Sequence, residues 1–339
     1  MVDSEPSLNI EAERLVPGEV LVFPQPAFLV GAAWAFAEIS EHDPKMREAK
    51  MLRVLDVLTG EYGQILDAIS AHVGQKRVVL AKNLLEPVLG LVMDISYLDF
   101  SLKDPVGFRS VRLLANSEKS NTWLRDVCAK YDDETFVNPA LFGVENIDGV
   151  TFSGFAEGGR VLKVDKTLLV SECLWDRRKN DEGAARLLQR GYKMAPLPVP
   201  INKIRPVHAD HSHIDSHAAL IKDQNDNPQL LVAKSYLLQG GGTSKKARYA
   251  AETVGVPVVV VDDKEFPGLA FNLIQFADKS VIVTAGAESL AAKLRELVGS
   301  DNVCETGSAI RLLPVILGGS IRCLTNVIDK KVLEILSED

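Results

Sequence analysis

The chain has 339 residues, of which 46% are hydrophobic, so it can bury a substantial core without help from crosslinks. Its net charge is −8, and no run of Lys or Arg is dense enough to neutralise a phosphate backbone. These totals argue against a nucleic-acid partner, and they are compatible with a cleft that attracts small cations.

The first 18 residues are largely polar and are predicted to form a flexible N-terminal tail. They lack the basic start and apolar stretch of a secretory signal. No membrane anchor is predicted, because the apolar stretch 23–36 is interrupted by prolines and is too short to span a bilayer. The four cysteines have no CxxC spacing, which favours a reducing compartment. We therefore expect a cytoplasmic protein.

Short segments rich in β-branched residues recur along the whole chain and predict strands. They are EVLVFP, KRVVLA, SVRLLA, ETFVN, RVLKV, TLLVSE, LLVAKSYLL, VPVVVVD, SVIVTAG and GSIRCLTNVI. Helical spacing predicts a pair of helices at 43–58 and 61–73, and single helices at 181–190, 243–254 and 286–298. This order predicts an α/β fold. Because no linker or composition shift marks a boundary, residues 19–339 are expected to form one domain of repeated small units.

Four of the six histidines, His208, His211, His213 and His217, lie within ten residues. On a strand the last three would share one face with Asp215, which a metal could exploit. Catalytic zinc needs further well-placed ligands, however, and no histidine follows His217, so no metal is expected. A polar strand edge is the preferred interpretation of His208, His211 and His217. His213 differs, because Asp215 would place a cation-binding carboxylate beside a proton carrier.

A second feature is the segment GGSIRCLTN at 318–326. Glycines before a cysteine let the backbone approach a ligand closely, and the polar residues after it can hydrogen-bond a reacting group. A lone cysteine in a strand is more often a small buried hydrophobe, so the local sequence leaves both interpretations of Cys323 open. Two acids, Asp126 in WLRD and Glu157 in EGGR, are equally ambiguous when each is considered alone. Asp126 is then a partner for Arg125 or a turn acid, and Glu157 is a solvated hairpin end.

Together these segments resemble one family. In chain order, WLRD, EGGRVLKVDKTLLVSECL, HIDSHAALI and GGSIRCLTN resemble the guanidine-modifying enzymes of the pentein superfamily, which includes arginine deiminase, agmatine deiminase and the amidinotransferases. The segment FNLIQFADKSVIV at 271–283 is similar to the Asn-containing strand that precedes the nucleophile in those enzymes. The resemblance covers residues 110–330.

The resemblance implies a five-bladed α/β propeller with pseudo-fivefold symmetry and a site at its axis. It makes Cys323 the nucleophile and His213 the general acid and base. It makes Glu157 the partner that orients His213, and it makes Asp126 and Asp215 the carboxylates that bind the guanidinium group.

The implied activity is that of a hydrolase of arginine metabolism, acting as a deiminase on a cationic guanidine substrate. The C–N bond is cleaved to ammonia and a ureido product through a covalent thiouronium on the nucleophile, and no cofactor is implied. An amidinotransferase with the same site is an alternative, as is a non-catalytic binding protein of the same fold. A homo-oligomer is compatible with the sequence. Three arginines near the motifs, Arg160, Arg177 and Arg178, favour arginine or a related amino acid, whose carboxylate they could bind.

Overall fold

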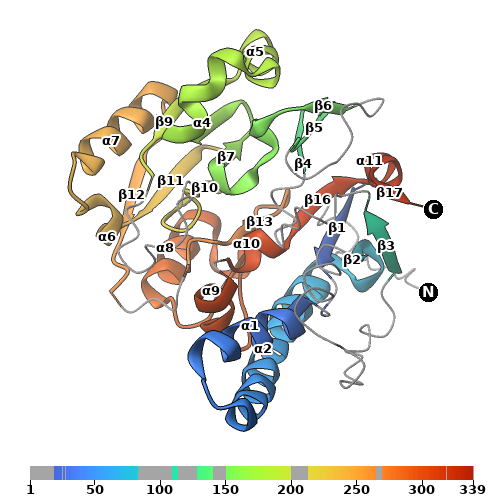
Figure 1. Cartoon of the computed structure of the whole chain (residues 1–339). Helices are drawn as coiled ribbons and strands as arrows, with labels where there is room; N and C mark the ends of the chain where they lie inside the picture. Colours follow the sequence, from blue (N-terminus) through green and yellow to red (C-terminus); the bar gives the residue numbers. More distant parts are fainter. Residues whose placement is uncertain are drawn as a thin grey trace, which may run out of the picture.

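The computed structural model describes residues 19–24, 26, 28–82, 109–113, 128–139, 150–199, 213–264, 269–317 and 319–338. The expected tail at 1–18 lies outside the described residues, as do Asp126, His208 and His211. Helices and five separate sheets alternate along the chain (Figure 1), so the α/β prediction is confirmed. Among the described residues, no helix is both long and apolar enough to cross a membrane.

Four of the sheets have three strands and the same topology. In each of these sheets the first two strands are antiparallel to each other, and the third strand is parallel to the second. The sheets are β4 (Cys128–Tyr131), β5 (Glu134–Val137) and β6 (Val150–Phe152); β7 (Val161–Val164), β8 (Thr167–Ser171) and β9 (Lys193–Leu197); β10 (Ala218–Lys222), β11 (Pro228–Ala233) and β12 (Val258–Val261); and β13 (Ile274–Gln275), β14 (Val281–Val283) and β15 (Val303–Glu305).

The fifth sheet joins the two ends of the described chain. It has the order β16–β1–β2–β3–β17, and β16, β1 and β2 repeat the antiparallel-then-parallel pattern. Its strands are β1 (Glu19–Pro24), β2 (Val78–Lys82), β3 (Arg109–Leu113), β16 (Asn326–Asp329) and β17 (Ser337–Glu338). Five related units therefore build the fold, and one of them is closed by strands from both ends of the chain.

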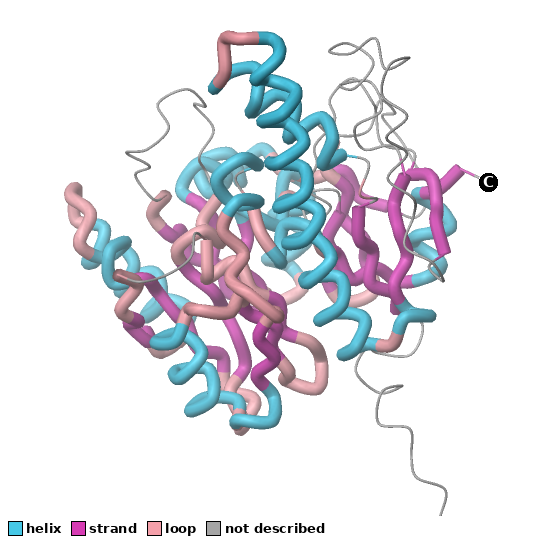
Figure 2. Tube along the Cα trace, turned by 90° about the horizontal axis from the view of Figure 1, so that it is seen from below, coloured by secondary structure: helices cyan, strands magenta, loops and turns pink. Residues whose placement is uncertain are grey.

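Helices provide the crossovers that parallel strand pairs require, and they lie on the outside of the sheets (Figures 1 and 2). The crossover helices are α1 (Phe28–Ser40) and α2 (Pro44–Val73), α4 (Glu172–Arg177) and α5 (Glu182–Gln189), α6 (Lys234–Leu237) and α7 (Thr243–Val254), and α8 (Glu288–Val298). The remaining helices are α9 (Leu312–Leu317), α10 (Ile321–Leu324) and α11 (Lys330–Leu336). Short 3-10 helices are η2 (Gln75–Arg77), η6 (Gly154–Ala156), η7 (Gly158–Arg160), η8 (Arg178–Asn180) and η9 (Ser300–Asn302).

The second strand of several units is largely buried, because it lies in the middle of its sheet. Every residue of β8 and β14 is buried, and the last four residues of β11 are buried too. Strands covered on both faces are expected to be continuous hydrophobic runs of this kind. One apolar cluster, extending in sequence from Leu162 to Val298, joins three consecutive units into a common core.

Several sequence predictions about local structure are wrong. The expected strand LLVAKSYLL, for example, ends at Ala233, and its second half contains the helix α6. The expected helix pair at 43–73 is one continuous helix, α2, which begins at Pro44 behind the N-cap Asp43 and ends before Gly74. Gly60 does not interrupt it: a mid-helix glycine costs only about 1 kcal/mol, while buried residues such as Leu58 and Tyr62 on either side anchor the helix to the core.

The expected strand at 319–328 is also wrong in its first half. Residues Ile321–Leu324 form the helical turn α10, and the strand β16 begins only at Asn326. The physical reason is tertiary, because the side-chain oxygen of Asn272 accepts hydrogen bonds from the backbone N–H groups of Ser320 (3.2 Å) and Cys323 (3.0 Å). These bonds tie the chain into a turn that its apolar alternation does not predict.

Candidate active site

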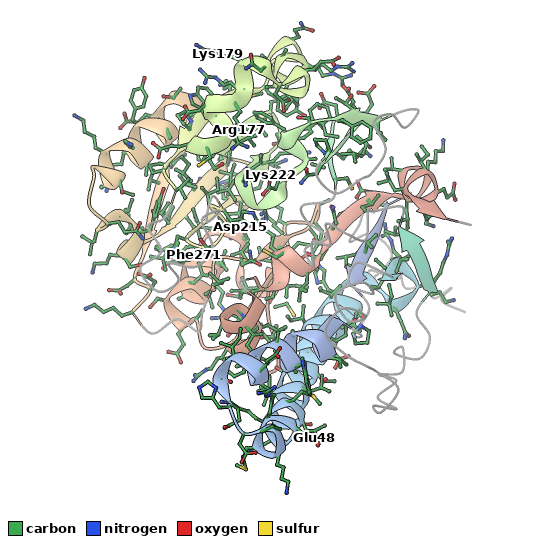
Figure 3. The ribbon with its side chains drawn as sticks, viewed as in Figure 1. Glu48, Arg177, Lys179, Asp215, Lys222 and Phe271 are labelled. Atoms are coloured by element: carbon green, nitrogen blue, oxygen red, sulfur yellow. The ribbon has the colours of Figure 1, made fainter. Side chains whose placement is uncertain are left out.

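The candidate site residues occupy the same position in successive units. Glu157 precedes β7, His213 and Asp215 precede β10, Asn272 precedes β13, and Cys323 precedes β16. Each therefore lies in the segment that leads into the first strand of its unit. Figure 3 places Asp215 near the middle of the molecule. The repeated topology thus explains how residues far apart in sequence reach one region.

Glu157 and His213 form a pair. The His213 Nε2 atom lies 3.0 Å from Glu157 Oε1, and the two side chains are 29% and 17% exposed. A carboxylate at one ring nitrogen fixes the orientation of an imidazole and stabilises its protonated form. The guanidinium Nε of Arg160 lies 2.8 Å from the same glutamate oxygen. Glu157 is therefore shared between a histidine and an arginine, and it is not a solvated hairpin end.

The His213 ring lies directly against the backbone of Gly159. A Cβ atom added at Gly159 would be 2.1 Å from His213 Nδ1, and the Ile214 N–H donates to the Gly159 carbonyl at 2.8 Å. No side chain can occupy that space. The second glycine of EGGR is thus required by the close approach of the imidazole.

Cys323 is held beside Asp215 by Asn272. The Asn272 side-chain amide donates to Cys323 Sγ and to Asp215 Oδ2, each at 3.0 Å, and the sulfur is 3.7 Å from that carboxylate oxygen. Cys323 is only 4% exposed. The amide N–H of Asn272 and the carboxylate of Asp215 therefore fix the position of the sulfur from two sides.

The Asp215 carboxylate is buried and already binds a guanidinium group. Arg322 Nη1 donates to Asp215 Oδ2 at 2.6 Å, and their side chains are 15% and 2% exposed. The same nitrogen donates to the Gly158 carbonyl at 2.7 Å, and Nη2 donates to the Val161 carbonyl at 2.9 Å. This arginine therefore connects the segment before β7 with the candidate site.

The remaining predicted residues are elsewhere. His217 stacks on Tyr236 with ring centroids 6.1 Å apart, and His213–His217 form a turn, so the expected strand face is wrong for this part of the motif. Within the described ranges, no three His, Cys, Asp or Glu side chains are grouped as a metal would require. Arg178 covers the Trp175 ring at 3.6 Å, and Figure 3 places Arg177 at the outer helix α4, away from Asp215. Neither arginine lies at the candidate site.

Burial lowers the pKa of His217 below its ordinary value of 6.5, although the charges of Asp263 and Asp215 oppose the shift. Because this pKa is lower in the folded chain, the unfolded chain takes up the proton at a higher pH. The neutral His217 therefore contributes to the free energy of unfolding above about pH 6.5, and this contribution is lost as the pH falls through the folded pKa. We expect His217→Gln to flatten the decline in the free energy of unfolding below that pH, measured by urea unfolding. An unchanged decline would contradict this assignment.

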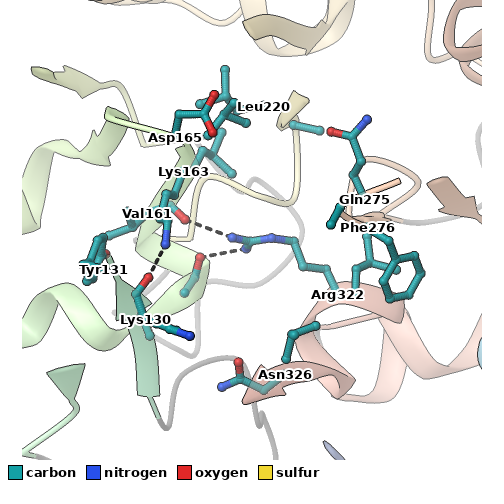
Figure 4. A pocket seen from close by; sticks show the side chains of 18 of the residues that line it. Lys130, Tyr131, Val161, Lys163, Asp165, Leu220, Gln275, Phe276, Arg322 and Asn326 are labelled. Carbon is teal, nitrogen blue, oxygen red and sulfur yellow. Dashed lines mark hydrogen bonds between the residues drawn. The ribbon is translucent and has the colours of Figure 1, made fainter. Parts of the chain in front are cut away.

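A cavity of about 650 Å³ lies behind the candidate site (Figure 4). It is lined by residues from the first strand of all five units, β4, β7, β10, β13 and β16. Arg322 and Gly158 line it, and so do Lys163, Asp165 and Lys222, which lie near the C-terminal ends of β7 and β10. Arg322 therefore lies between the cavity and the carboxylate of Asp215.

Sequence reasoning missed Asn272 and Arg322. Asn272 lies in the segment 271–283 that was noted for its similarity, but nothing local indicates that one amide would contact both a thiol and a carboxylate. Arg322 adjoins Cys323 and looks like an ordinary polar residue of a strand. Its role depends on the helical turn α10, which the sequence does not predict.

No family model and no curated protein matches the chain. A solved structure of a presumed peptidyl-arginine deiminase is similar over 95% of this chain and 99% of its own, with 13% identity and a TM-score of 0.53. The chain shares the fold of that structure. A structure of a dimethylarginine dimethylaminohydrolase variant, an adduct with S-methyl-L-thiocitrulline, matches over 91% of this chain and 98% of its own, with 10% identity and a TM-score of 0.47. At 13% identity the similarity to the first of these structures shows the fold alone, and in this respect it agrees with the resemblance seen in the sequence.

Proposed function

We propose that this chain is a hydrolase of a guanidine substrate, of the arginine or agmatine deiminase type, with Cys323 as its nucleophile. The observation that carries the proposal is Asp215, whose carboxylate binds a guanidinium group at 2.6 Å while the same oxygen lies 3.7 Å from the Cys323 sulfur. A carboxylate in that position can hold the carbon of a planar cation within reach of a thiolate. The fold shared with a presumed peptidyl-arginine deiminase supports the proposal.

The reaction begins with addition of the Cys323 thiolate to the guanidinium carbon, which forms a C–S bond. A C–N bond then breaks as protonated His213 gives its proton to the departing nitrogen, and ammonia leaves. The neutral imidazole next takes a proton from water, whose oxygen adds to the carbon of the thiouronium. The C–S bond breaks with its electron pair returning to sulfur, the hydroxyl proton goes to solvent, and the ureido product is released.

The second carboxylate of the clamp is proposed to be Asp126. It precedes β4 by two residues in the sequence, which matches the position of Glu157, His213 and Cys323 ahead of their own strands. We further propose that the five sheets are the blades of a pseudo-fivefold propeller, because the first strands of all five line one cavity. In that arrangement the segments before these strands meet at one end of the axis.

Gly159→Ala tests the role of the Glu157–His213 pair in this reaction. The added methyl group would lie 2.1 Å from His213 Nδ1, so the ring cannot keep its present position beside Glu157. We expect kcat to fall about 100-fold, since a misplaced catalytic group costs that much. Gly60→Ala is the matched control, because no atom lies within 4 Å of its added Cβ. Equal kcat values for the two variants would contradict the assigned role.

Two alternatives use the same site. An amidinotransferase would form a similar thioether but would release the amine of its donor instead of ammonia. A non-catalytic binding protein is favoured by one observation, that Asp215 is paired internally with Arg322. That alternative predicts no turnover of any guanidine compound and no unusual reactivity of Cys323.

The experiment that tests the proposal is incubation with a panel of guanidines that includes arginine and agmatine. Ammonia and ureido product are both scored, with Cys323→Ala measured in parallel. We expect both products from the wild-type chain and neither from the variant. Ammonia from the variant would exclude the covalent mechanism, and a guanidine product formed only when an amine acceptor is added would favour the amidinotransferase.

A further inference from the structure

Arg322 is bound to the carboxylate that a substrate would need, that of Asp215. Its Nη1 donates to Asp215 Oδ2 at 2.6 Å, and that oxygen is also the one contacted by Asn272 at 3.0 Å and faced by the Cys323 sulfur at 3.7 Å. The guanidinium of Arg322 is therefore chemically the same group as the proposed substrate head, bound to the same carboxylate.

A substrate cannot simply bind beside Arg322. Two guanidinium groups at one carboxylate would place like charges close together, and Asp215 is only 1% exposed, so water screens the repulsion poorly. A substrate cation must then replace Arg322 at Oδ2. Substrate binding is therefore an exchange of one guanidinium group for another.

The cavity behind the site gives Arg322 a place to move. It has a volume of about 650 Å³, and Arg322 already lines it together with the carbonyl-bearing residues Gly158 and Val161. In Figure 4 the guanidinium bonds to these two carbonyl groups at the edge of the open space. A change of side-chain rotamer could carry it from Asp215 into the cavity without movement of the backbone.

We propose that Arg322 is a gate, a resident guanidinium that closes the Asp215 clamp and is displaced into the cavity by substrate. The inference rests on the proposed function and adds regulation of the same site. A substrate cation breaks the ion pair between Arg322 and Asp215 but forms a new one with Asp215. A neutral ureido product cannot form such a pair. Return of Arg322 to Asp215 then expels the product after each turnover.

Arg322 competes with any compound that binds at Asp215, so it should weaken the binding of every such compound by the same factor. The test uses n-butylguanidine and n-butylurea, which share one tail and differ in head-group charge. The measurement is the concentration of each compound at which the rate of Cys323 alkylation by iodoacetamide falls to half. In Arg322→Met, we expect this concentration to fall about tenfold for both compounds, which corresponds to about 1.4 kcal/mol of competition.

Two other outcomes would overturn the gate. If Arg322 only repels cations through its charge, Arg322→Met will bind n-butylguanidine more tightly and n-butylurea as before. If Arg322 positions Asp215, the variant will bind both compounds more weakly. Arg322→Gln is measured as well, because its amide can still donate hydrogen bonds if the unpaired Asp215 destabilises Arg322→Met.

The gate and the proposed function fail in different ways. Equal protection of the wild-type chain and both variants would overturn the gate while leaving guanidine binding at Asp215 intact. Absence of protection by either compound in every variant, with Cys323 alkylated normally, would overturn the gate and the proposed function together.

Discussion

Cys323→Ser should reduce turnover of the guanidine substrate by about 10⁴-fold or more, because loss of a covalent nucleophile removes the main reaction path. A serine hydroxyl can still accept a hydrogen bond from the Asn272 amide, which contacts the sulfur at 3.0 Å in the wild-type chain. The folded structure should therefore persist, and thermal unfolding should change little. The measurement is the steady-state rate of ammonia release at saturating substrate, compared with the unfolding temperature of the same sample.

The matched control for this variant is Cys304→Ser. Cys304 is only partly buried, lies in β15 and enters none of the described contacts around Asp215. It should keep the wild-type rate. If Cys323→Ser also keeps that rate, the sulfur is a packing residue and the covalent mechanism is wrong.

Asp215→Asn should have the second largest effect, and it should reduce both activity and stability. The neutral amide cannot form an ion pair with a substrate cation, so we expect kcat/KM to fall about 10³-fold. The same change leaves the Arg322 guanidinium, whose side chain is 15% exposed, without its partner carboxylate at 2.6 Å. Removing one member of a buried ion pair costs about 3 kcal/mol, which urea unfolding can measure.

The double variant Asp215→Asn/Arg322→Gln separates these two effects. Removing both charges leaves no unpaired ion, so most of the lost free energy of unfolding should return. The activity should stay low, because the substrate still lacks its carboxylate. Recovery of activity together with stability would mean that Asp215 serves only to hold Arg322.

The repeated local patterns of the fold are readable from the sequence. The predicted helix at 243–254 coincides with α7, and the runs TLLVSE and SVIVTAG contain the buried central strands β8 and β14. Such segments are predictable because their own apolar pattern matches their burial. The turn α10 is not predictable, since Asn272, far away in sequence, determines where Cys323 lies.

The candidate site is predictable only in part for the same reason. Glu157, His213 and Asp215 stand out because their motifs carry unusual residues at short spacing. Arg322 carries no such signal, because an arginine in a strand-like segment is normally exposed. Its contact with Asp215 exists only once the segments before β10 and β16 have been brought together by the fold.

The central claim is that a thiolate at Cys323 forms a bond with the carbon of a guanidine substrate. The most direct measurement is the intact mass of the chain after acid quenching of a reaction with agmatine or arginine, followed by mapping of the modified peptide. We expect an adduct on Cys323 whose mass equals that of the substrate less ammonia, whereas an amidinotransferase would leave only an amidino group. A burst of ammonia equal in amount to the enzyme with Cys323 unmodified at every quench time, or an adduct on Cys128, Cys173 or Cys304 instead, would contradict this mechanism.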